Sequence, residues 1–181
     1  MDRYWLLTWT TYGTWLPGDD RGFVSNVLDG EGPEVKHNLP GTKPDAKQRG
    51  LLLSATANRK GPAVFLALGQ AEVVLEQLSE TAQYRGWDLL AVAIMGNHIH
   101  VIVGVPGDPD PATLIGIFKS YVSRLLNKHF CRPVSGTWWT ESGSRRKLPD
   151  EAAVLAAIAY VGRQNFPLLI WRKGERGAKA P

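Results

Sequence analysis

The apolar and polar positions of the chain repeat with the period of a strand in some segments and with that of a helix in others. Residues 3–12 are rich in aromatic and β-branched side chains that partly alternate with other types, which predicts a strand. Apolar residues at helical spacing predict helices over 70–84 and 112–129. Between these helices, apolar runs at 87–95 and 99–105 flank a Gly-Asn dipeptide and predict an antiparallel hairpin.

Shorter elements follow in the C-terminal third of the chain. Residues 138–140 and 145–148 are predicted to be two short strands about a Ser-Gly turn. A helix is predicted from about residue 150 to 164, and Pro167 ends it. The order strand, helix, strand, strand, helix, strand, plus one extra helix, predicts an α+β, ferredoxin-like (RRM-like) fold. In this fold an antiparallel sheet carries two helices on one face, and the extra helix follows at the C-terminal end.

A long segment near the N-terminus breaks these patterns. Residues 17–62 contain seven glycines and five prolines, so about a quarter of the segment consists of turn-forming residues. Connections of this length without regular structure are uncommon and are often functional. We expect one domain over residues 1–181 that carries a long irregular insertion at about 17–62, with a short helix near 45–59.

Composition narrows the class of protein. The 181 residues are 44% apolar and 21% charged, which is typical of a folded globular domain. No apolar run approaches the ~18 residues that a membrane-spanning helix needs. The N-terminal segment lacks the features of a signal peptide, and the single cysteine, Cys131, cannot form an internal disulfide. We therefore expect a cytoplasmic protein.

The net charge of +4 is unevenly distributed along the chain. Residues 142–181 contain eight basic residues and three acidic ones, a net charge of +5, so the preceding 141 residues carry −1. A basic C-terminal quarter on a nearly neutral body indicates a polyanion as partner. A solvated charged surface and tail would give the same count, so charge alone leaves both interpretations open.

Two histidines on the second strand of the hairpin are the first candidates for chemistry. His98 and His100 are two residues apart, so their side chains share one face of the strand, while Ile99 and Val101 point to the other. Two adjacent imidazoles are half of a site for a divalent transition-metal ion. With a third ligand and open positions, such an ion could act as a Lewis acid. The alternative is a pair of polar residues on a solvated sheet face.

The last predicted helix carries a face of small residues. Ala153 and Ala157 would let this helix lie close to the sheet, and Tyr160 and Gln164 follow on the same face, one turn apart. This arrangement would place Tyr160 over the histidines and let the Gln164 amide oxygen reach a metal ion. In the alternative interpretation, Tyr160 is a core aromatic and Gln164 lies on the surface near the helix end.

These motifs together resemble those of a known family. The segment 95–103, with its His-hydrophobe-His core, is similar to the corresponding motif of the single-tyrosine HUH transposases, and 160–164 resembles their nucleophile helix. Within this family the chain is most similar to the REP-associated tyrosine transposases, over most of residues 3–171. One difference is Gly96, where the family usually has proline before Asn-His. Further similar segments are 10–22, 118–121 and 138–140.

The resemblance implies a specific reaction. A divalent metal ion, Mg²⁺ or Mn²⁺, would be held by His98, His100 and Gln164 and would polarise the scissile phosphate of single-stranded DNA. Tyr160 would attack that phosphate, giving a 5′-phosphotyrosine and a free 3′-hydroxyl, and a second 3′-hydroxyl would complete strand transfer. The expected partner is single-stranded DNA that contains a hairpin, and the chain would work as a monomer or a homodimer.

The resemblance and the charge distribution together supply DNA-binding candidates. Basic side chains would follow the phosphates, and aromatic side chains beside turns, including Trp138 and Trp139, would stack on unpaired bases unless they belong to the core. Lys119 would otherwise be part of the solvated face of its helix. A replication-type or conjugative nickase, a host-domesticated relative and a non-catalytic nucleic-acid-binding module are the alternative functions. The candidate residues are Tyr12, Trp15, Lys119, Arg145, Arg146, Lys147, Arg163, Arg172 and Lys173.

Overall fold

The computed structural model describes residues 1–21 and 47–175, so part of the insertion expected at 17–62 lies outside the described residues. The elements follow the predicted order, with the short helix of the insertion present and one additional strand near the C-terminal end. None of the described helices is long and apolar enough to cross a membrane. The elements are β1 (Arg3–Thr10), α1 (Arg49–Ala57), α2 (Leu68–Arg85), β2 (Asp88–Ile94), β3 (His98–Val105), α3 (Pro111–His129), β4 (Ser144–Leu148), α4 (Glu151–Val161) and β5 (Leu169–Arg172).

The strands of the described chain form one antiparallel sheet in the order β4-β1-β3-β2-β5. The first four strands have the ferredoxin-like order, so the predicted α+β fold is confirmed. Strand β5 is not predicted by the sequence pattern; it pairs with β2, with Ala91 opposite Arg172, and extends the sheet at that edge. The strand predicted at 138–140 is instead a single bridge between Thr11 and Trp139.

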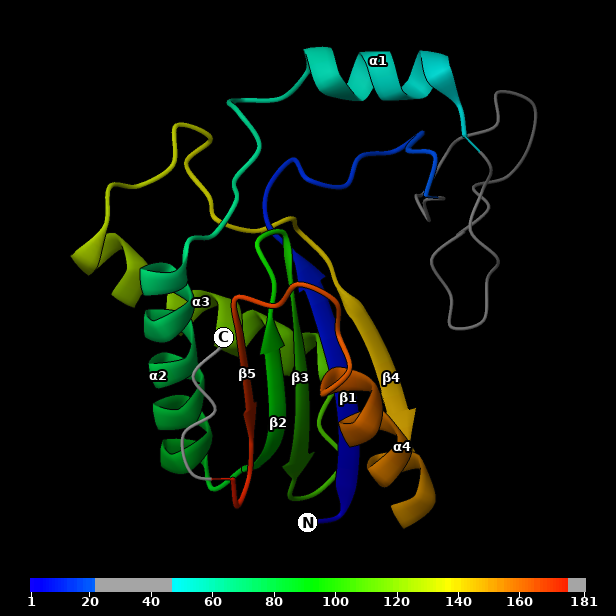
Figure 1. Ribbon diagram of the computed structural model, residues 1–181, viewed down its shortest axis with the longest axis vertical. Helices are drawn as coiled ribbons and strands as arrows, with labels where there is room; N and C mark the ends of the chain where they lie inside the picture. Colours follow the sequence, from blue (N-terminus) through cyan, green and yellow to red (C-terminus); the bar gives the residue numbers. More distant parts are fainter. Residues whose placement is uncertain (22–46, 176–181) are drawn as a thin grey trace.

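Helices α2 and α3 cover one face of the sheet, and the main core lies beneath them (Figure 1). Leu7 and Trp9 of β1 point into this core because alternate residues of a strand share a face. Phe118 of α3 is fully buried and stacks on Trp9, with ring centroids 6.4 Å apart. Trp138 and Trp139 also belong to this core, at 3% and 5% exposure, so neither offers a surface for stacking on a base.

Helix α4 lies on the opposite face of the sheet and covers part of it (Figure 1). Ala157 and Val161 of α4 are buried in a smaller cluster that includes Ala93 of β2. Small side chains on both sides allow the helix to approach the sheet closely. The helix begins after Asp150, whose carboxylate accepts a hydrogen bond from the Ala153 backbone N–H at 2.8 Å.

Lys119 of α3 lies in the interior, whereas the sequence predicts it at the surface or in contact with DNA. Its Nζ donates hydrogen bonds to the backbone carbonyls of Thr140, Glu141 and Ser142 at 2.7, 3.3 and 2.7 Å. The segment that leads into β4 can therefore turn its carbonyl groups inward without losing their hydrogen bonds. Burial lowers the pKa of Lys119 to about 8, and the negative charge of Glu141 acts in the opposite direction. Because its ammonium group is hydrogen-bonded to the protein's own backbone, Lys119 has a structural role.

Replacing Lys119 by Met should destabilise the fold. Three carbonyl groups lose their donor, so we expect the free energy of unfolding in urea to fall by about 1–3 kcal/mol. Lys128→Met, on the exposed side of the same helix, is the matched control and should change it by less than about 0.5 kcal/mol. Equal effects of the two substitutions would contradict the structural role of Lys119.

A comparison of the wild type with Lys119→Met also tests the pKa of Lys119. Burial lowers this pKa from 10.5 to about 8, so the folded chain binds the proton more weakly than the unfolded chain does. The penalty for burying the charge is complete below the folded-state pKa and disappears as the pH rises toward the unfolded-state value. The stability of the wild type should therefore increase relative to Lys119→Met between about pH 8 and pH 10. A difference that stays constant over this range would rule out the lowered pKa.

Candidate active site

Strand pairing fixes where the two histidines lie. Antiparallel pairing of β1 with β3 places Thr8 opposite His100 and Thr10 opposite His98. All four side chains therefore project from the sheet face that also carries α4. The neighbouring β3 residue Ile99 is fully buried in the core on the other face. The shared face predicted for His98 and His100 is thereby confirmed.

Each imidazole is held in place through its Nδ1 atom. His100 Nδ1 is hydrogen-bonded to Thr8 Oγ1 at 2.7 Å, and His98 Nδ1 to Asn97 Oδ1 at 2.7 Å. The two ring centroids are 4.8 Å apart, with the ring planes at 84°. Within the described part of the chain, His100 Nε2 is buried and has no hydrogen-bond partner. The Nδ1 contacts thus orient both rings, and the Nε2 of His100 is left for another ligand.

Burial keeps both imidazoles neutral at physiological pH. Burial, followed by the nearby His98, lowers the pKa of His100 to about 4. The pKa of His98 is also lowered, first by burial and then by the positive charge of Arg21. A neutral imidazole keeps a nitrogen lone pair, which is the form that binds a metal ion.

Helix α4 brings Tyr160 to the histidine pair. The ring centroid of Tyr160 is 5.4 Å from that of His100, with the planes at 74°. Tyr160 is nevertheless 49% exposed, so it is not a core aromatic. The next basic residue, Arg163, is exposed, and its Nε donates a hydrogen bond to the Ala159 carbonyl at 3.2 Å. An aromatic hydroxyl, a histidine and a cation therefore lie at the same end of α4.

Gln164 lies beyond the helix on which the sequence predicts it. Helix α4 ends at Val161, and Gln164 follows in the linker to β5. Its Nε2 donates a hydrogen bond to the backbone carbonyl of Tyr160 at 3.1 Å, so its amide oxygen is not used in this bond. In residues 1–21 and 47–175, no hydrogen bond joins Gln164 to either histidine. The same residues contain no cluster of three or more His, Cys, Asp or Glu side chains that could hold a metal ion.

The three basic residues of β4 do not share one face of the sheet. Arg146 lies opposite Leu6, which belongs to the cluster under α4, so Arg146 projects on the histidine face. Arg145 lies opposite Leu7 of the main core and, like Lys147, projects on the face covered by α2 and α3. The basic cluster seen in the sequence is therefore divided between the two faces of an edge strand.

The two basic candidates of the C-terminal segment are held by neighbouring groups. The Arg172 guanidinium lies so close to Gly162 that any side chain added there would collide with it. Arg172 also pairs with Glu175 at 3.0 Å, and Lys173 pairs with Asp88 at 2.6 Å. The Arg172 side chain therefore lies at the C-terminal end of α4. Lys173 is paired with Asp88 at the start of β2, whereas the histidines lie beside the other end of that strand.

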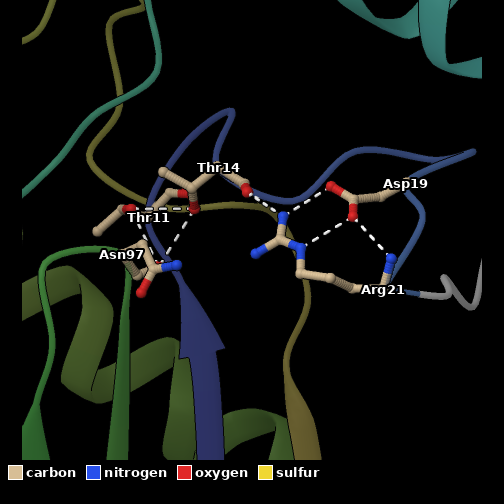
Figure 2. Close-up of polar contacts among 5 residues, drawn as sticks. All are labelled: Thr11, Thr14, Asp19, Arg21 and Asn97. Atoms are coloured by element: carbon tan, nitrogen blue, oxygen red, sulfur yellow. Dashed lines mark hydrogen bonds and ion pairs between the residues drawn. The ribbon is translucent and has the colours of Figure 1, made fainter. Parts of the chain in front are cut away.

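A polar network ties the loop after β1 to Asn97, the residue before His98 (Figure 2). The Asn97 carbonyl accepts hydrogen bonds from the Thr11 backbone N–H, the Thr11 hydroxyl and the Thr14 hydroxyl at 2.9, 3.1 and 3.2 Å. Arg21 donates to the Thr14 carbonyl at 2.7 Å and forms a two-point ion pair with Asp19 at 2.8 and 2.6 Å. These hydrogen bonds hold the pKa of Asp19 well below its usual range. The loop thereby anchors the residue that precedes the first histidine.

The aromatic candidates on this loop have different surroundings. Trp15 is 44% exposed, and the Arg21 guanidinium carbon lies 5.0 Å from the centroid of its ring. The Tyr12 hydroxyl accepts a hydrogen bond from the Lys60 backbone N–H at 2.7 Å, so Tyr12 connects the loop to the far end of the insertion. Arg21 is absent from the residues predicted as functional, and its one signal in the sequence is its place within the similar segment 10–22.

Two solved structures are similar to this chain. A REP-associated tyrosine transposase, solved bound to a REP hairpin, is 10% identical, with a TM-score of 0.46 over 88% of this chain and 64% of that chain. This chain thus spans less than two thirds of that relative's length. A protein of Deinococcus radiodurans R1, described as a candidate transposase, is 14% identical, with a TM-score of 0.41 over 92% of this chain and 94% of that chain. No curated protein matches the sequence.

A family profile gives the firmer result. The profile described as "Transposase IS200 like" matches residues 63–153, which is just over half of the chain. The matched segment includes both histidines and ends before Tyr160. Because the profile covers half of the sequence, the chain belongs to the IS200-like transposase family.

Proposed function

We propose that this chain nicks and rejoins single-stranded DNA as a transposase and that Tyr160 is its nucleophile. The observation that carries the proposal is the contact between Tyr160 and His100, at 5.4 Å between ring centroids, on a sheet face that remains open to solvent at Tyr160. A single-stranded DNA with a hairpin is the proposed substrate.

The two imidazoles fit a divalent metal ion. Each ring is oriented through Nδ1, and the buried Nε2 of His100 has no other partner in the described residues. His98 and His100 would hold Mg²⁺ or Mn²⁺, and Gln164 would supply a third ligand through its amide oxygen. Imidazole nitrogen suits Mn²⁺ better than Mg²⁺, which prefers oxygen ligands. When bound, the ion would supply Lewis-acid polarisation of the scissile phosphate.

The proposed reaction uses the Tyr160 hydroxyl directly. Its oxygen gives up its proton and forms a bond to the scissile phosphorus while the bond from phosphorus to the 3′-oxygen breaks, and the leaving 3′-oxygen takes up a proton, so the protons balance. The products are a 5′-phosphotyrosine and a free 3′-hydroxyl, so the energy of the phosphodiester is conserved in the adduct. Attack by another 3′-hydroxyl reverses the step and joins new strands. The half-exposed position of Tyr160 supports access of a DNA strand to its hydroxyl.

Three arginines would guide the DNA strand on the histidine face. Arg146 projects from β4 on this face, Arg163 follows Tyr160 along the chain, and Arg172 lies against the end of α4. Contacts of this kind with phosphates position a strand without reading its sequence. Arg145 lies on the other face of the same strand, so it would not contact a DNA strand on the histidine face.

Tyr160→Phe should abolish the covalent adduct while leaving the fold intact, because it removes only the attacking oxygen. The substrate is single-stranded DNA from the flanks of the gene, incubated with Mg²⁺ or Mn²⁺ or with a chelator, and the adduct is measured on a denaturing gel. Tyr84→Phe, at an exposed tyrosine of α2 on the opposite face, is the matched control and should form adduct as the wild type does. Adduct at the wild-type level in Tyr160→Phe would refute the proposed nucleophile.

Arg146→Ala should weaken binding and cleavage of this DNA more than Arg145→Ala, because only Arg146 lies on the histidine face. Loss of one phosphate contact to a single strand should lower the slope of log affinity against log salt by about 0.7. Fluorescence anisotropy at several salt concentrations measures the slope, and single-turnover cleavage measures the rate. If both substitutions lower the cleavage rate equally, the DNA does not follow the proposed face.

A further inference from the structure

Phe166 is unusual in both its backbone and its exposure. Its φ is 53°, and within the described residues it is the only non-glycine residue with a positive φ. It is also 97% exposed, more than any other large apolar side chain in the described part of the chain. It lies in the linker between α4 and β5, two residues after Gln164.

This conformation is unfavourable for Phe166 itself. A side chain on an L-residue with positive φ is crowded by its own backbone, and a bulky residue there is a true outlier. Pro167 follows and restricts the backbone of Phe166 further. A fully exposed ring gains no burial that would offset this strain. Strain of this kind persists where the surrounding structure imposes it, and it is concentrated at functional sites.

Backbone hydrogen bonds fix both ends of the linker that carries Phe166. On the N-terminal side, the Arg163 backbone N–H donates a hydrogen bond to the Tyr160 carbonyl at 3.2 Å, at the end of α4. On the C-terminal side, the Leu168 backbone N–H donates to the Ile94 carbonyl at 2.8 Å, where β5 joins the sheet. Figure 1 shows this linker passing from α4 across the front of the sheet to β5.

We infer that Phe166 is a stacking platform for an unpaired base of the DNA strand that reaches Tyr160; this inference rests on the proposed function. The strand must pass the end of α4 to present a phosphate to Tyr160, and Phe166 is anchored six residues further along the same short segment. Arg163 lies on this linker, and the guanidinium of Arg172 lies against Gly162 where the linker begins. Both provide positive charge for the flanking phosphates. A phenyl ring has no hydrogen-bonding group, so it would hold a base through its face and tolerate several base types.

The test measures binding separately from chemistry. All proteins carry Tyr160→Phe, and the probe is a fluorescein-labelled single-stranded oligonucleotide from the flanks of the gene. Phe166→Ala should weaken binding roughly 5- to 100-fold, the range for loss of one stacked base. Phe166→Trp should bind as well as Phe166 does, because it keeps an aromatic face. Tyr84→Ala removes a comparably exposed ring from α2 and should have no effect.

A scan with abasic nucleotides identifies the stacked base. One abasic position should weaken binding to the protein with Phe166 by about the same factor as Phe166→Ala, and should have little further effect on Phe166→Ala. Phe166→Gly accepts a positive φ without strain, so it should weaken binding in the same way while raising the melting temperature by about 2–4 °C. Loss of binding in this more stable variant cannot result from misfolding.

The outcomes separate the inference from the proposed function. If the wild type forms the Tyr160 adduct but Phe166→Ala binds the probe normally, the stacking role is wrong and the proposed function stands. If Phe166→Ala changes the sedimentation coefficient of the free protein and leaves DNA binding unchanged, the ring contacts a second copy of the chain, which also overturns the inference. If the stacking pattern is found but no adduct forms in the wild type, the inference stands and the catalytic proposal fails. If the wild type binds no DNA, both are overturned.

Discussion

The alternation of side chains along β3 determines which residues face the core and which face α4. Its core side carries Ile99 and other fully buried apolar residues beneath α2 and α3, so a shift of one residue would expose them and place His98 and His100 in that core. Strand β1 imposes the same register, because Trp9 must face the core and Thr8 then faces the other way. The histidines are thus fixed on one face by apolar residues that take no part in their chemistry.

Helix α4 covers only part of the histidine face, and this partial cover determines both the burial of the imidazoles and the exposure of Tyr160. The helix lies close enough for Tyr160 to contact His100, and burial of the imidazoles lowers both pKa values so that they remain neutral. Tyr160 itself stays half-exposed. A helix that covered the whole face would exclude a DNA strand, whereas a bare face would leave the imidazoles solvated and protonated more readily. The loop that Arg21 and Asn97 hold in place adds a cation beside His98 without covering it.

Local patterns predict most of this fold, while roles that depend on distant partners are not visible in the sequence. Alternation at His98 and His100, together with the alanine face of α4, is sufficient to predict that Tyr160 lies near the histidines. Strand β5 escapes prediction because its four residues gain their pairing only from the edge of β2. The helical pattern predicts Lys119 at the surface. Its structural role becomes visible only when the backbone carbonyls that precede β4 are seen to accept its hydrogen bonds. Gln164, predicted within the last helix, lies outside it because α4 ends at Val161, three residues earlier.

Binding of a divalent metal ion by His98 and His100 is the most direct test of the proposed active site. Crystals of the protein grown with MnCl₂, with diffraction data collected on both sides of the manganese absorption edge, would locate any bound Mn²⁺ by its anomalous signal. The two oriented imidazoles, and the buried His100 Nε2 that has no hydrogen-bond partner in the described residues, predict a single strong peak within bonding distance of Nε2 of both His98 and His100, next to Tyr160. A fully occupied manganese peak elsewhere, or no peak at the histidines at saturating Mn²⁺, would contradict the proposed active site.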